Sequence, residues 1–162
     1  MKPHILRLIL TTLILLQLKI LEQPLIYPIA SLFILDSTDC GLYKLYDKDY
    51  DCSKTNISYQ IKDKIIDLYA YWVFLALFFD KLDPITLNLY IIFFIYRFYG
   101  VYLFYKTKNI EYIKIFFDGM NGLLILFELT KTFDVIKNNY SICLGLMMGM
   151  KILFEKIHHN MN

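Results

Sequence analysis

The feature that most constrains this sequence is a series of long apolar blocks, separated by short charged or proline-containing breaks. Residues 85–105 (ITLNLYIIFFIYRFYGVYLFY) form one such block. It has the roughly 20 mostly apolar residues that a helix needs to cross the hydrocarbon core of a bilayer. Hydrophobic residues make up 57% of the 162-residue chain, which exceeds their usual share in soluble domains. The pattern predicts an all-α fold, a polytopic transmembrane helical bundle.

The apolar blocks define about six helices within a single transmembrane domain, 1–162. Pro24 breaks the first two blocks apart, and Asp83-Pro84 precedes the fourth. The first block reads as a retained helix rather than a cleaved signal peptide. Gln17 and Lys19 interrupt its apolar run, and no small-residue cleavage site follows. The predicted helices are 3–22, 25–38, 60–79, 85–105, 112–130 and 140–156.

Lysine and arginine residues predict the orientation of these helices. With six helices, both termini and segments 36–63 and 106–114 share one side, and most of the Lys and Arg residues lie there. Because cytosolic loops carry an excess of Lys and Arg, we expect that side to be cytosolic. The Asn56-Ile57-Ser58 sequon and a disulfide in the same segment would suit the opposite side. We prefer the Lys/Arg rule, so Cys40, Cys52 and Cys143 are expected to be reduced thiols.

Four aspartates lie where the second predicted helix ends and the third begins. Asp36 and Asp39 close one helix, and Asp63 and Asp67 open the next. Residues three or four apart share a helix face, so adjacent antiparallel helices would bring the four carboxylates together. The helix dipole favours acids at a helix start and disfavours them at a helix end. A divalent cation would offset this cost and the mutual repulsion, whereas a solvated acidic loop is the alternative.

This segment resembles the motif of the CDP-alcohol phosphotransferases, which is D-x-x-D-G-x-x-A-R, a spacer and then G-x-x-x-D-x-x-x-D. The present chain reads Asp36-x-x-Asp39-Cys40-x-x-Tyr43-Lys44 and then Tyr59-x-x-x-Asp63-x-x-x-Asp67. In that family the motif lies at the cytosolic ends of the second and third of six transmembrane helices. The helix count and sidedness predicted above agree with that arrangement.

The resemblance implies a metal-dependent enzyme of phospholipid synthesis. Such an enzyme moves a phosphoalcohol or phosphatidyl group from a CDP-linked donor to an acceptor hydroxyl and releases CMP. Asp36, Asp39 and Asp63 would hold Mg²⁺ or Mn²⁺, Asp67 would be the general base, and Lys44 would bind substrate. The expected partners are the lipid bilayer and the CDP-linked lipid or alcohol, and a homodimer is possible. The net charge of +2 gives no reason to expect a nucleic acid.

Arg97, Asp118 and Glu128 lie inside the fourth and fifth predicted helices, where ionisable residues usually face a partner or a cavity. Arg97 could bind an acceptor phosphate or a lipid headgroup, or it could pair with Asp118 and hold two helices together. Two other functions therefore stay open. One is a non-catalytic membrane assembly or scaffold subunit. The other is a small solute or ion transporter that uses Arg97, Asp118 and Glu128.

Overall fold

The computed structural model describes residues 3–46, 48–53 and 55–160, apart from the side chains of residues 39, 46 and 154–160. In this described part of the chain all regular secondary structure is helical, which confirms the predicted all-α class. The chain divides into two compact units, Met1–Leu82 and Asp83–Asn162. Each unit is described by itself below.

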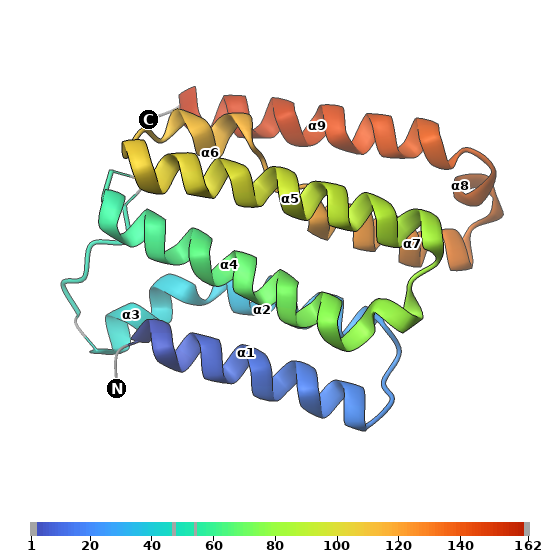
Figure 1. Ribbon diagram of the computed structural model, residues 1–162, viewed down its shortest axis with the longest axis horizontal. Helices are drawn as coiled ribbons and strands as arrows, with labels where there is room; N and C mark the ends of the chain where they lie inside the picture. The colour runs from blue at the N-terminus through green and yellow to red at the C-terminus, as the bar shows by residue number, and fades with distance from the viewer. Residues whose placement is uncertain (1–2, 47, 54, 161–162) are drawn as a thin grey trace. The chain divides into compact units, whose positions relative to one another are not determined.

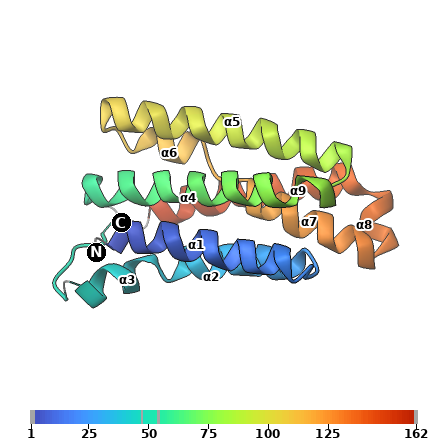
Figure 2. The ribbon, with the colours of Figure 1, turned by 60° about the horizontal axis from the view of Figure 1, so that its bottom comes forward.

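The first unit is an antiparallel group of helices (Figures 1 and 2). Its elements are α1 (Pro3–Ile20), α2 (Ile26–Ser37), α3 (Asp39–Tyr46), α4 (Ile57–Phe78) and the 3-10 turn η1 (Phe79–Lys81). Helix α1 packs mainly along α4 and also contacts α2 and α3. The side chain of Asn56 accepts a hydrogen bond from the N–H of Tyr59 and thereby caps the start of α4.

The second unit is built around α5, the longest helix of the described chain. Its elements are α5 (Pro84–Thr107), α6 (Glu111–Ile115), α7 (Met120–Thr132), α8 (Asp134–Asn138) and α9 (Tyr140–Asn160). Helix α5 contacts α6 and α7, and α7 contacts α8 and α9. Asp83 caps α5, and Pro84 follows at the first helical position, where its missing N–H has no cost.

Two of the described helices are long and apolar enough to cross a membrane: α1, with 18 residues, and α5, with 24. They correspond to the predicted spans 3–22 and 85–105. Helix α2 and the apolar part of α9, Tyr140–Leu153, are apolar but shorter. At a rise of about 1.5 Å per residue, the 12 residues of α2 cover only part of a hydrocarbon core that is about 30 Å thick.

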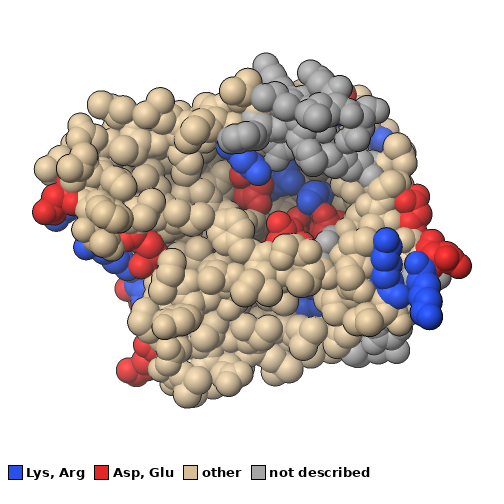
Figure 3. Space-filling view, turned by 180° about the vertical axis from the view of Figure 1, so that it is seen from behind, with Lys and Arg blue, Asp and Glu red and all other residues tan. Residues whose placement is uncertain are grey.

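Helix α1 buries two polar side chains beside Leu15 and exposes several large apolar ones. Arg7 and Thr11 are buried, whereas Leu13 and Ile20 are 57% and 70% exposed. In a water-soluble protein the opposite distribution is the rule, while charged residues within a membrane normally face the protein interior. Most of the face of the molecule in Figure 3 is neither acidic nor basic, and its charged atoms gather in a few groups. The exposed face of α1 is thus largely apolar.

The single helix predicted over 112–130 is wrong, because the chain leaves the helical conformation at Phe116 and re-enters it at Met120. The guanidinium of Arg97 donates hydrogen bonds to the main-chain oxygens of Ile113 and Phe116, which a continuous helix would use itself. The carboxylate of Asp118 accepts from the N–H of Met120 and starts α7. Two helices therefore replace one.

The expectation that Cys40 and Cys52 are reduced thiols is also wrong, since a disulfide joins them. Their Cα atoms are 5.8 Å apart, a usual separation for such a bond. The predicted helices end at residue 38 and resume at residue 60, so α3 is not expected from the sequence. Cys40 lies in the first turn of α3, and the segment between α3 and α4 brings Cys52 back to it. Cys143 is a free thiol.

Candidate functional site

Three of the four motif aspartates converge in the first unit. One carboxylate oxygen from each of Asp36, Asp63 and Asp67 lies within 4.8 Å of the other two. Asp36 belongs to the last turn of α2, while Asp63 and Asp67 lie one turn apart on the buried face of α4. We call these three residues the acidic cluster. Asp39 begins α3, but its side chain lies outside the described residues.

Arg7 from α1 ties the acidic cluster together. Its Nη1 atom donates to Oδ1 of Asp63 at 2.7 Å, and its Nη2 atom donates to Oδ1 of Asp67 at 2.8 Å. The same Nη2 lies 3.5 Å from Oδ1 of Asp36. In the sequence, Arg7 contributes to the predicted orientation, and nothing was predicted of its place in the site. The missed signal was a charge inside a predicted span, which usually has a buried partner.

Lys64 is the second cation of the site. Its ammonium lies 2.7 Å from Oδ2 of Asp63 and 3.0 Å from Oδ2 of Asp67. Lys64 is not among the predicted site residues either, although a lysine three positions before an aspartate on a helix is well placed to contact it. Arg7 and Lys64 thus set two positive charges against the carboxyl groups of the acidic cluster.

Asp36 is the open member of the acidic cluster. Its side chain is 51% exposed, compared with 7% for Asp63 and 10% for Asp67. Partial burial and the negative charges of Asp67 and Asp63 raise the pKa of Asp36 to about 7, although Lys64 and Arg7 act in the opposite direction. Asp36 lies in α2, and not in α1 or α5, the two described helices that are long enough to cross a membrane. Any ligand that reaches the cluster from solvent meets this carboxyl first.

A small cavity of about 10 Å³ adjoins the acidic cluster and is lined in part by Arg7, Thr11, Asp36 and Asp67. That is roughly the room that a single water molecule needs. A nucleotide is far larger. A phosphate-bearing ligand would therefore have to lie over the exposed Asp36 and not within this cavity.

The oxygen atoms of the acidic cluster suit Mg²⁺ or Mn²⁺, because both ions prefer hard carboxylate ligands. The two cationic side chains compete for the same atoms. Both oxygens of Asp63 and both oxygens of Asp67 already face Arg7 or Lys64. A divalent cation would have to share these oxygens with the two side chains or displace Lys64.

Aromatic rings occupy two motif positions at which the resembled family has small residues. Tyr43 and Tyr59 are 2% and 5% exposed. The Tyr43 ring stacks on Tyr50 with centroids 4.7 Å apart and meets the edge of Tyr59 at 5.4 Å. These rings fill space that small residues leave for the close approach of backbone and ligand. A nucleotide would therefore need a position different from the one that the family motif implies.

The other predicted site residues lie apart from these contacts. Lys44 is exposed in the last turn of α3. Arg97 belongs to the second unit, is buried, and donates to the main-chain oxygens of Ile113 and Phe116.

Asp118 accepts from the N–H of Met120, and Glu128 pairs with Lys131 at 2.6 Å. Arg97, Asp118 and Glu128, the three residues considered for a transporter, therefore each have a hydrogen-bond or ion-pair partner within the second unit. These contacts suit a structural role for the three residues.

No protein-family model, no curated protein and no solved structure matches this chain. The candidate site is accordingly defined by its own residues and their geometry.

Proposed function

We propose that this chain is a multi-pass membrane protein whose acidic cluster is the centre of a metal-dependent phosphotransferase, with Asp36 and Asp63 as metal ligands and Asp67 as the base. The observation that carries the proposal is the convergence of Asp36, Asp63 and Asp67 from two different helices. Their order and spacing also match the motif of the CDP-alcohol phosphotransferases, which the sequence resembles. The donor would be a CDP-linked lipid or alcohol, and the products would be a phosphodiester and CMP.

The contacts of Arg7 support the multi-pass arrangement within the first unit. Because Arg7 reaches Asp36 and Asp63, the start of α1, the end of α2 and the start of α4 lie at one level. At the other end of α1, Lys19 pairs with Asp80 of η1 at 2.7 Å. Chain segments that return repeatedly to the same two levels suit successive passes through a bilayer.

We place both termini and segment 36–63 in the cytosol, where CDP-linked donors would be supplied. The excess of Lys and Arg on that side supports this placement. The Cys40–Cys52 disulfide is the observation that counts most against it, because disulfides persist mainly in oxidising compartments.

In the proposed reaction Asp67 accepts the proton of the acceptor hydroxyl. The hydroxyl oxygen attacks the donor phosphorus nearer the lipid or alcohol, and a new P–O bond forms. The bond from that phosphorus to the bridging oxygen breaks, and CMP leaves with the electron pair. Before Asp67 can take the proton, Lys64 must release Oδ2 of Asp67, which lies 3.0 Å from its ammonium.

Asp36 and Asp63, with Asp39 of the sequence motif, would hold Mg²⁺ or Mn²⁺. Such an ion, when bound, supplies positive charge against the diphosphate of the donor.

A second function, that of a non-catalytic scaffold subunit, is supported by a different observation. Arg7 and Lys64 already face both oxygens of Asp63 and of Asp67. Such a network could hold α1, α2 and α4 together without any metal. On this alternative the acidic cluster would be a structural clamp in the membrane.

One experiment separates the two functions. Purified full-length protein in lipid nanodiscs is titrated with Mn²⁺, followed by electron paramagnetic resonance, and is assayed for CMP release from CDP-diacylglycerol and CDP-alcohols with several acceptors. A phosphotransferase binds Mn²⁺ and releases CMP, and Asp63→Asn abolishes both. The matched control Asp51→Asn lies outside the acidic cluster and should change neither. A folded protein that neither binds Mn²⁺ nor releases CMP would be the scaffold.

A further inference from the structure

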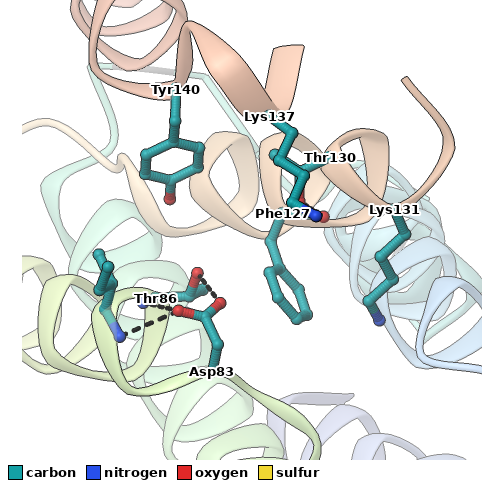
Figure 4. A pocket seen from close by; sticks show the side chains of 8 residues that line it. Asp83, Thr86, Phe127, Thr130, Lys131, Lys137 and Tyr140 are labelled. Carbon is teal, nitrogen blue, oxygen red and sulfur yellow. Dashed lines mark hydrogen bonds between the residues drawn. The ribbon is translucent and has the colours of Figure 1, made fainter. Parts of the chain in front are cut away.

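Asp83 and the acidic cluster differ in what holds their carboxylates. In the pocket at the start of α5, Asp83 accepts hydrogen bonds from the N–H groups of Ile85 and Thr86 and from the Thr86 hydroxyl (Figure 4). Helix α5 thus uses this carboxylate itself. In the acidic cluster, part of the corresponding role falls to the side chain of Lys64. Main-chain donors at a helix start are fixed, whereas a lysine ammonium can turn away on its flexible four-carbon stem.

The ammonium of Lys64 lies between a proposed metal ligand and the proposed base. It is 2.7 Å from Oδ2 of Asp63 and 3.0 Å from Oδ2 of Asp67. In the proposed function Asp63 holds the divalent cation and Asp67 accepts the proton of the acceptor hydroxyl. One positive group therefore occupies an oxygen atom that each of these two roles requires.

Arg7 and Lys64 hold the acidic cluster in different ways. Arg7 belongs to α1, its side chain is only 3% exposed, and it pairs with carboxylates of both α2 and α4. Its departure would break contacts between three helices. Lys64 is 19% exposed, and its pairs with Asp63 and Asp67 stay within α4. Because breaking these two pairs separates no helices, Lys64 is the cation that can leave.

The charges of the acidic cluster favour an exchange of Lys64 for a divalent cation. Without Lys64 the buried carboxylates of Asp63 and Asp67 would share the single guanidinium of Arg7, and an incompletely compensated buried charge is costly. A divalent cation supplies the missing charge and one more, at the side where Asp36 adds a third carboxyl group. The same exchange opposes entry of the ion, because the lysine has to be displaced first.

We propose that Lys64 is an internal competitor of the divalent cation, and that its displacement from Asp63 also frees Asp67 to act as the base. The inference rests on the proposed function of the acidic cluster. Because one ammonium holds an oxygen of both carboxylates, loss of its place at Asp63 loosens its hold on Asp67 as well. Lys64 thereby lowers the affinity for the ion and links ion binding to the release of the base.

The test compares Mn²⁺ binding by purified full-length variants in lipid nanodiscs, without substrate, followed by electron paramagnetic resonance. Lys64→Met has a similar length but no charge. It should bind Mn²⁺ at least about tenfold more tightly than the wild type, because a positive charge within a few ångströms strongly opposes a cation. Lys64→Arg keeps the charge and should bind no more tightly than the wild type.

Lys62→Met is the matched control. It removes the same charge from an exposed position of the same helix, where solvent and salt screen the effect. The affinity for Mn²⁺ should therefore change by less than about threefold. A purely structural role of Lys64 would leave the affinity unchanged or lower it, so a gain on removal of the lysine is specific to competition.

Thermal unfolding gives a second readout. Without Mn²⁺, Lys64→Met should unfold at a lower temperature than the wild type, because its buried carboxylates are incompletely compensated. Saturating Mn²⁺ should raise its Tm by more than it raises that of the wild type, since a tighter ligand stabilises the folded state more. If Lys64→Met fails to fold, Lys64→Gln, whose amide can still donate to a carboxylate, takes its place in both measurements.

Three results would overturn the inference. Lys64→Met that binds Mn²⁺ no more tightly than the wild type would show that Lys64 does not compete, while the metal site would stand. An equal gain in Lys62→Met would reduce the effect to the general charge of α4. A lack of Mn²⁺ binding in the wild type and in each Lys64 variant would remove the metal site, and the proposed function would fail together with the competition.

Discussion

Arg7 and Asp63 form a buried ion pair of 2.7 Å although 56 residues separate them in the sequence. Their side chains are only 3% and 7% exposed. The pair joins the start of α1 to α4, and Asp67 extends it by one helical turn. Removing Arg7 would leave the two buried carboxylates of Asp63 and Asp67 with one ammonium, that of Lys64, between them, and an incompletely compensated buried charge is costly.

We therefore expect Arg7→Gln to lower the free energy of unfolding by about 3–5 kcal/mol, the usual effect of breaking a buried pair. Denaturant unfolding in detergent, followed by circular dichroism, measures the change. Lys19→Gln is the matched control on the same helix. Its partner Asp80 is exposed, and exposed pairs add little stability. Equal losses in the two variants would contradict a special role of Arg7.

Asp67→Asn tests the proposed general base. The amide keeps the shape of the carboxylate but cannot accept a proton, so CMP release should fall by about 10²–10⁴-fold while Mn²⁺ binding remains. Asp36→Asn should instead raise the Mn²⁺ concentration needed for half-maximal activity. An Asp67→Asn protein that turns over at the wild-type rate would assign the base to another residue.

Asp83 makes the start of α5 sensitive to acid. Partial burial pushes its pKa upward, but hydrogen bonds from Thr86 and Ile85 outweigh this effect and lower the pKa. A carboxyl whose pKa is lower in the folded state stabilises the protein above its unfolded pKa, near 3.9. That stabilisation is lost as the pH falls from about 4 through the folded pKa.

Asp83→Ala should accordingly cost about 1 kcal/mol at pH 7, as for the loss of an N-cap, and less at pH 3. Unfolding at the two pH values measures the difference. Asp83→Asn keeps a capping oxygen without a charge and should show a smaller dependence on pH. The same cost for Asp83→Ala at both pH values would argue against a cap that depends on the charge.

Gly100 allows Phe116 to pack directly against α5. A Cβ atom at this glycine would overlap the Cβ and Cγ atoms of Phe116. We expect Gly100→Ala to destabilise the protein by about 1–3 kcal/mol, the usual cost of overpacking. Gly145→Ala is the matched control, because no heavy atom lies within 4 Å of the added methyl group. It should be neutral or slightly stabilising, and thermal unfolding of both variants checks the difference.

The cysteines test the connection between α3 and α4. Without reductant a maleimide reagent should modify only Cys143 in the denatured protein, and after reduction it should modify Cys40 and Cys52 as well. Mass spectrometry counts the adducts.

The cytosolic placement of segment 36–63 predicts in addition that Asn56 carries no glycan in cells. A glycan at Asn56 would place segment 36–63 on the side opposite the cytosol, against the Lys/Arg rule. CDP-linked donors would then not be supplied on the side of the acidic cluster. The disulfide would then agree with the location.

The parts of the fold that the sequence predicts correctly depend on local chemistry. The bounds of α5 follow from one apolar run that starts after Asp83-Pro84, and the turn-to-turn spacing of Asp63 and Asp67 places both on one face of α4. The parts that it does not predict depend on distant partners. Arg97 breaks a predicted helix by taking carbonyl oxygens 16 and 19 residues away.

The same distinction applies to the acidic cluster. The sequence shows which carboxylates are available, but not that Arg7 enters between them, because that contact exists only once α1 and α4 have packed. The contact of Arg7 with Asp63 and Asp67 is therefore visible only in the tertiary structure.

The inward position of Arg7 also bears on how the protein is made. An arginine near the centre of an isolated helix costs about 2.5–3.5 kcal/mol to insert, and less toward the helix end. Its counterions Asp63 and Asp67 are synthesised some 56 and 60 residues later. On the proposed membrane placement, Arg7 would have Asp36 of α2 nearby, but neither Asp63 nor Asp67, until α4 has emerged from the ribosome. Stable integration of α1 would then be coupled to the translation of α4, and a nascent chain that stops between α2 and α4 would hold its first helix in the bilayer weakly.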